Sequence, residues 1–153
     1  MTPKSLLIAA GIAGLATAAF AGAGRQTVKP EDHYEHLKTV WGGVYAAPEA
    51  DRGKQAAATL CARCHGTDLK GAKATGLTGT KFFDRWADLR LADVVNYIQS
   101  AMPHEHEVFV SRDSTRDIVS FMLRESGVPA GRDAMTADLA AMNEIVITRP
   151  PRK

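Results

Sequence analysis

The sequence predicts an all-α fold. One segment in the second half of the chain places apolar residues at the i, i+3, i+4, i+7 spacing of a helix with one buried face, and a later segment groups apolar residues on one helical face. An earlier segment begins with proline and continues into alanines, a pattern typical of a helix start. No β-hairpin signal stands out in the chain, so helices should dominate.

The first helix is expected to open at Pro48 and Glu49 and to run through 55–58 to a pair of cysteines. Proline suits a first helical turn, because its missing N–H has no partner there, and alanine has the highest helix propensity. Residues 66–81 are rich in Gly, Thr and Lys and should form a loop. An aromatic cluster follows this loop: Phe82, Phe83 and Trp86.

The second helix should span about 91–100. It is expected to end near Met102, because a residue that precedes proline avoids the α region and Pro103 follows. Its apolar stripe is Leu91, Val94, Val95 and Ile98.

The last long helix should begin near Ser111 or Ser114 and end at Gly127. Beyond it we expect a short helix within 133–144 and an extended piece at 145–147. The apolar face of the long helix is Ile118, Val119, Met122 and Leu123, and Met122 is expected to be a core residue there.

The two cysteines indicate which cofactor the protein binds. Cys61 and Cys64 are the only two in the chain, and His65 follows them directly. This C-x-x-C-H string is the attachment signature of a c-type haem: two thiols one helical turn apart add to the haem vinyl groups, and the adjacent imidazole reaches the iron. The sequence therefore predicts one covalent haem c, with His65 as the proximal ligand.

Other uses of these cysteines stay open. A disulfide between Cys61 and Cys64 would close a very small loop and stabilise little. A thioredoxin-like redox pair needs a βαβ setting, which the surrounding sequence does not suggest. A zinc site would need His104 and His106 as further ligands, at a spacing unlike the common zinc fingers.

Met102 is the expected sixth ligand of the iron. It lies at a helix exit and is followed by Pro103, so its thioether would sit on a fixed loop. The alternatives are His104 and His106, which would lower the reduction potential relative to His/Met ligation. Ordinary packing is the remaining possibility for a methionine.

The N-terminus has the pattern of a secretory signal peptide. Lys4 precedes an apolar stretch at 6–20 that is short for a membrane span of ~20 residues. Small residues place cleavage near Ala21 or Ala23. We expect residues 1–23 to be removed and the protein to be periplasmic, without a membrane span, or membrane-anchored if the signal is retained.

Charge says less about function. The chain has 19 basic and 17 acidic residues, a balance that does not favour a nucleic-acid partner. Eight basic and four acidic residues fall within 51–90, so a mild positive rim near the haem could steer an acidic partner, or could be an ordinary solvated surface.

With these motifs in view, the chain resembles the class I cytochromes c. Within them it is most similar to the monohaem cytochromes c associated with periplasmic quinoprotein (PQQ) alcohol dehydrogenases. The matching stretches are 40–45, 52–54, 61–71, 77–79, 82–86, 101–103, 117–123 and 127–131.

The resemblance implies a cytochrome c-like fold, with three main helices around one covalently attached haem and Met102 as distal ligand. It also implies a helix crossing where Gly53 permits close approach and Phe121 supplies an aromatic. Two departures are clear: Ala57 replaces a frequent aromatic, and 74–76 lacks the family's proline, whose carbonyl orients the proximal histidine. Another carbonyl must take that role, and the sequence does not identify it.

The implied organisation is a signal peptide, an N-terminal extension at 24–47, a cytochrome c domain at 48–131 and a C-terminal extension at 132–153. The implied function is one-electron transfer without substrate turnover, from a dehydrogenase donor to an oxidase or another cytochrome of the respiratory chain. The alternatives are a haem-based sensor or ligand-binding protein with an open or weakly ligated sixth position, and a peroxidase-like enzyme.

Three residues are candidates for contacts with the haem propionates. They are Trp86, Arg85 and Arg90, and for Trp86 core packing is an equal alternative.

Overall fold

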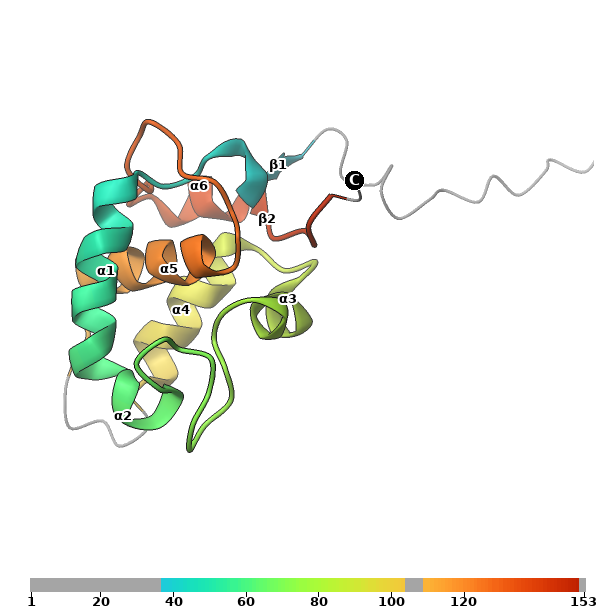
Figure 1. Ribbon diagram of the computed structural model, residues 1–153. Helices are drawn as coiled ribbons and strands as arrows, with labels where there is room; N and C mark the ends of the chain where they lie inside the picture. The colour runs from blue at the N-terminus through green and yellow to red at the C-terminus, as the bar shows by residue number, and fades with distance from the viewer. Residues whose placement is uncertain (1–36, 104–108, 152–153) are drawn as a thin grey trace, which may run out of the picture.

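The computed structural model describes residues 37–103 and 109–151 and confirms the all-α prediction (Figure 1). Three long helices dominate: α1 (Ala47–Leu60), α4 (Leu91–Ala101) and α5 (Arg112–Glu125). The shorter elements are β1 (Lys38–Thr39), the 3-10 turn η2 (Val40–Gly42), α2 (Ala62–His65), α3 (Thr80–Trp86), α6 (Leu139–Asn143) and β2 (Ile145–Val146). Strands β1 and β2 pair in parallel, which is the only sheet in the described ranges.

Helix α1 begins as the sequence predicts. Pro48 lies in the first turn, and the Glu49 carboxylate accepts a hydrogen bond from the Ala46 N–H at 2.9 Å. This bond satisfies one of the amide donors that a helix start leaves unpaired. Its start therefore follows from local sequence alone.

Helices α1 and α5 cross in close contact. A Cβ on Gly53 would lie 1.8 Å from the carbonyl oxygen of Asp117, so only glycine fits at the crossing. The Arg52 guanidinium donates to the Asp117 carboxylate at 2.7 and 2.8 Å, and Phe121 is buried nearby on α5. The expected roles of Gly53 and Phe121 in the crossing are consistent with this geometry.

The ends of α4 and α5 also follow local signals. Met102 is extended after the last turn of α4, as a residue before proline should be. The Ser111 hydroxyl caps α5 by accepting from the Ser114 N–H at 3.1 Å, which decides between the two expected starts. At the other end Gly127 adopts φ +84°, and the Val128 N–H closes onto the Leu123 carbonyl at 3.0 Å.

The segments that flank 48–131 complete the core. The buried Tyr45 hydroxyl donates to the Val128 carbonyl at 2.8 Å, and the Glu49 carboxylate also accepts from the Met135 N–H at 2.8 Å. Val40 and Ile147 are fully buried. Figure 1 shows β1 and β2 side by side next to α6.

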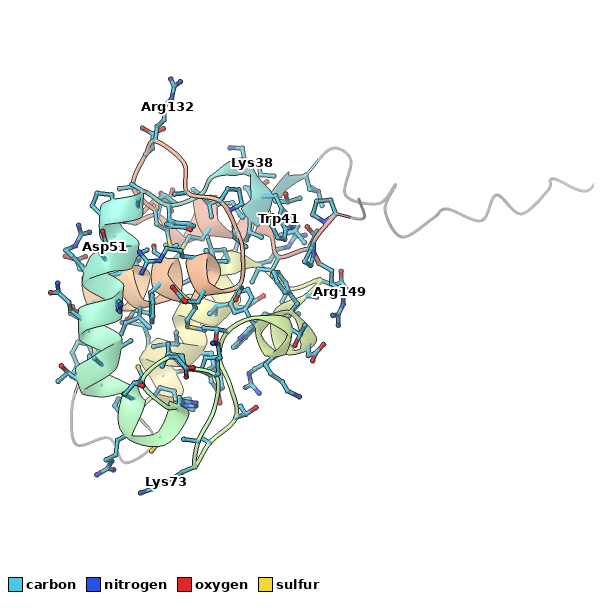
Figure 2. All side chains as sticks on the ribbon, viewed as in Figure 1. Lys38, Trp41, Asp51, Lys73, Arg132 and Arg149 are labelled. Carbon is cyan, nitrogen blue, oxygen red and sulfur yellow. The ribbon has the colours of Figure 1, made fainter. Side chains whose placement is uncertain are left out.

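Charged side chains lie at the periphery of this core. Figure 2 shows Lys38, Asp51, Arg132 and Arg149 projecting outward, with Lys73 at the tip of the loop beyond α2. Within residues 37–103 and 109–151, no helix is both long and apolar enough to cross a membrane. The expected signal peptide at 1–23 and the alternative ligands His104 and His106 lie outside the described residues.

Gly53→Ala should destabilise the protein by roughly 1–3 kcal/mol, because its methyl group would overlap the Asp117 carbonyl and force α1 and α5 apart. Denaturant unfolding of the two proteins measures this difference. Gly42→Ala is the matched control, since a Cβ there meets nothing within 4 Å. Equal stability losses in the two variants would contradict the crossing argument.

Glu49→Ala should lower the free energy of unfolding by roughly 2–4 kcal/mol, because two amide donors lose a charged acceptor that is only 5% exposed. Thermal or denaturant unfolding provides the measurement. Glu144→Ala removes an exposed carboxylate and should change stability by no more than about 0.5 kcal/mol. If Glu49→Ala lowered the free energy of unfolding as little as Glu144→Ala, the Glu49 carboxylate would not stabilise the contact between the start of α1 and Met135.

Candidate functional site

A cavity of about 380 Å³ opens between the long helices and the loop that follows α2. Its volume is in the range of small-molecule and cofactor sites. Five different helices, α1 to α5, contribute to its wall or border it. The apolar part of the lining comes from Leu60, Leu77, Ile98, Val110, Ile118 and Met122.

The two cysteines lie in this wall, one helical turn apart. Helix α1 ends at Leu60, and Cys61 then precedes the single turn of α2, which contains Cys64 and His65. Both thiols are free, so no disulfide joins them in the structure. The arrangement presents two sulfurs from one turn to one cavity, as double thioether attachment requires.

Burial raises the pKa of the Cys61 thiol to about 11. A redox-active C-x-x-C pair depends on a lowered thiol pKa, which gives a reactive thiolate at neutral pH. Cys61 has the opposite property, and this argues against the thioredoxin-like alternative.

His65 is oriented by a backbone carbonyl. Its Nδ1 lies 2.7 Å from the carbonyl oxygen of Thr75, across the loop. The loop is held in place by the Ala74 N–H, which donates to the Cys64 carbonyl at 2.8 Å, and by the Gly71 N–H, which donates to the His65 carbonyl at 2.9 Å. With Nδ1–H donating to Thr75, Nε2 keeps its lone pair for a metal.

Thr75 is thus the carbonyl that sequence reasoning could not identify. It lies in the segment 74–76, where the cytochromes that the sequence resembles often have a proline. Only its position in the loop could have pointed to Thr75, because every residue type has a backbone carbonyl that can accept a hydrogen bond.

Met102 lines the same cavity from the end of α4, together with Pro103. It is partly buried and packs against the core. The structure therefore brings four predicted site residues to one cavity: Cys61, Cys64, His65 and Met102.

The zinc alternative depends on residues that the structure does not describe. His104 and His106 fall in the gap between the two described ranges. Among the residues on either side of that gap, no group of three or more His, Cys, Asp and Glu side chains could hold a metal ion.

A cation stacked between aromatic rings forms part of the wall. The Arg85 guanidinium carbon lies 4.9 Å from the ring centre of Trp86 and 4.5 Å from that of Tyr97. The two rings also meet edge to face at 5.5 Å. All three residues line the cavity, and sequence reasoning missed Tyr97, which is next to the apolar stripe of α4 rather than on it.

Arg90 occupies a different place. Its backbone N–H donates to the Asp93 carboxylate at 2.8 Å at the start of α4. Arg90 does not line the cavity. Of the three candidates for propionate contacts, the structure thus brings Arg85 and Trp86 to the site.

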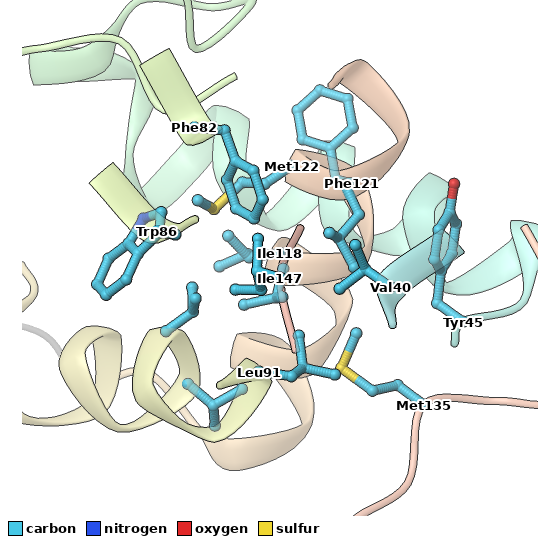
Figure 3. Packing of buried hydrophobic residues seen from close by; sticks show 14 of the residues in the cluster. Val40, Tyr45, Phe82, Trp86, Leu91, Ile118, Phe121, Met122, Met135 and Ile147 are labelled. Carbon is cyan, nitrogen blue, oxygen red and sulfur yellow. The ribbon is translucent and has the colours of Figure 1, made fainter. Parts of the chain in front are cut away.

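Met122 has two roles. It is buried, as expected of a core residue, and it also lines the cavity from α5 beside Ile118. Figure 3 shows Met122 close to Phe82, with Trp86 and Ile118 around it. A second methionine therefore reaches the site, and the ligand role expected of Met102 needs a direct test.

The residues present fit a covalently held haem. The walls are predominantly apolar, two free thiols stand one turn apart, and an imidazole with one engaged nitrogen faces the same cavity as a thioether. Cys61 and Cys64 would hold the macrocycle, and His65 and Met102 would bind the iron.

A family of known proteins and one solved structure are similar to this chain. Residues 48–122, a little under half of the chain, match the family described as Cytochrome C oxidase, cbb3-type, subunit III. The crystal structure of the sulfane dehydrogenase SoxCD from Paracoccus pantotrophus is similar, with 20% sequence identity and a TM-score of 0.47, over 82% of this chain and 68% of that chain. No curated protein matches the sequence. Residues 48–122 are thus similar to a cytochrome family, within an all-α chain.

Proposed function

We propose that this protein is a periplasmic monohaem c-type cytochrome that carries single electrons. The observation that supports this most directly is the convergence of Cys61, Cys64, His65 and Met102 on one apolar cavity, with His65 anchored to the Thr75 carbonyl. Haem bound there supplies a one-electron couple between ferric and ferrous iron. We assign the chain no substrate turnover of its own.

The protein's part is to orient ligands and to exclude water. The 2.7 Å contact to Thr75 fixes the His65 ring and its tautomer, so that Nε2 is the nitrogen available to the iron. The apolar lining offers little solvation to an added positive charge. This environment should favour the reduced state over the oxidised one.

Arg85 and Trp86 are the proposed contacts for the haem propionates. Stacking on two rings restricts the Arg85 guanidinium at the cavity wall, and a fixed cation there would attract a carboxylate. Because Arg90 lies outside the cavity lining, this part of the proposal depends on Arg85 and Trp86.

The proposed donor is a quinoprotein-type dehydrogenase, and the proposed acceptor is a component of the respiratory chain. The resemblance of 40–45 and 127–131 to the cytochromes of such dehydrogenases supports this choice. The signal peptide pattern at 1–23 supports the periplasmic location, where covalent haem attachment of this kind takes place.

Intact-mass measurement of the native protein tests the cofactor and the location together. We expect the mass of the polypeptide plus one haem, with the residues up to Ala21 or Ala23 missing. A variant with Cys61→Ala and Cys64→Ala should lose the covalent haem. Colourless material with only the polypeptide mass would refute the proposed function.

Met102→Ala should abolish the long-wavelength absorption band that is typical of methionine ligation to ferric haem. Met122→Leu is the matched control, since it removes the other thioether in the cavity wall and should leave the band intact. Loss of the band in the control alone would assign the ligand to Met122. Absence of the band from the unmodified protein would favour the sensor or ligand-binding alternative.

A further inference from the structure

Helix α3 carries two residues of the cavity wall, Arg85 and Trp86, yet it is not packed along another helix. In the described part of the chain, extensive helix contacts join α1 with α5 and α4 with α5 and α6, but none involves α3. Figure 1 shows α3 at the edge of the molecule. Its position must therefore depend on its own ends and on the side chains that cover it.

The two ends of α3 are tied to different parts of the fold. At the start, the Gly79 N–H donates to the Ser126 hydroxyl at 3.0 Å, just beyond α5. At the exit, the Asp88 N–H donates to the Ile147 carbonyl at 2.8 Å, and the Ile147 N–H donates to the Leu89 carbonyl at 2.9 Å. The exit is thus held by the C-terminal segment, far away in sequence.

The N-terminal segment covers the same helix. The Trp41 ring stacks on Phe83 of α3, with ring centres 5.9 Å apart and planes 16° apart. The Trp41 Nε1–H donates to the Thr148 carbonyl at 3.1 Å, and Arg149 pairs with Asp84 of α3 at 3.2 Å. We call residues 38–42 and 145–149 the terminal clasp, because together they hold α3 from one side.

We propose that the terminal clasp is a positioning device for the haem cavity, with Trp41 and Ile147 as its positioning residues. It holds α3 so that the Arg85 guanidinium stays stacked between Trp86 and Tyr97 in the cavity wall. Residues 38–42 and 145–149 lie outside the segment 48–122 that matches the cytochrome family. The proposed positioning of α3 therefore depends on segments beyond the family match. The inference rests on the proposed one-electron function.

The physical link to function is the environment of the iron. If α3 moves away, water gains access to an apolar cavity and the Arg85 cation leaves its fixed place. Added water solvates the more highly charged oxidised site and stabilises it relative to the reduced site. Loosening the clasp should therefore lower the reduction potential without removing either axial ligand.

Trp41→Leu in the haem-containing full chain tests this directly. At a fixed ambient potential, we expect the ratio of oxidised to reduced protein to rise by about tenfold, which is about 59 mV for a one-electron couple. Trp41→Phe keeps an aromatic ring on Phe83 and should recover most of the potential. The methionine ligation band should persist in both variants.

Tyr45→Phe is the control for stability alone. It removes the buried hydrogen bond to the Val128 carbonyl, which does not involve α3, so unfolding should become easier while the potential stays unchanged. A shift for Trp41→Leu no larger than that for Tyr45→Phe would overturn the proposal.

A milder variant keeps the test decisive if Trp41→Leu fails to fold. Trp41→Phe combined with Arg149→Ala removes two side-chain bonds of the clasp and leaves the core volume nearly intact. It should shift the potential in the same direction by a smaller factor, and an unchanged potential would refute the clasp. Unmodified protein that contains no haem would instead refute the proposed function. Failure of the clasp proposal and failure of the proposed function are therefore distinguishable.

Discussion

The close crossing of α1 and α5 at Gly53 is the constraint on which the rest of the structure depends. Because Gly53 has no side chain, its backbone packs directly against the backbone of Asp117. The C-terminal end of α1 then delivers Cys61 to the cavity, and α5 delivers Met122 from the other side. The ion pair of Arg52 with Asp117 adds to this crossing at the surface, where such pairs contribute little.

The loop after α2 orients the histidine that the helices bring to the cavity. Its backbone returns to α2 and places the Thr75 carbonyl against the His65 ring. Leu69 within it has φ +54°, a left-handed conformation that is unfavourable for a leucine, and its side chain is fully buried. Burial of that side chain offsets the backbone cost and keeps the loop in the one shape that orients the histidine.

The terminal segments enlarge the hydrophobic core beyond the segment 48–122. A typical small domain has little apolar surface to bury, and here Val40, Met142 and Ile147 extend the core beyond the family match. Trp41 and Arg149, from the same terminal segments, contact α3, which makes no extensive contact with another helix in the described part of the chain. Stability and cavity geometry are thus linked through one set of contacts.

Local signals in the sequence predicted the three long helices and the haem attachment, but not α3, which begins at Thr80 inside the expected loop. Proline and glutamate predicted the start of α1, Ser111 was one of two expected caps of α5, and the order of cysteines and histidine predicted the cofactor, because each depends on residues a few positions apart. Only the tertiary structure decided that Thr75 holds His65, that Tyr97 joins Arg85 in the wall, and that Arg90 stays outside it. A backbone acceptor has no residue signature, and side chains from separate helices meet only after the chain has packed, so sequence spacing could not reveal these contacts.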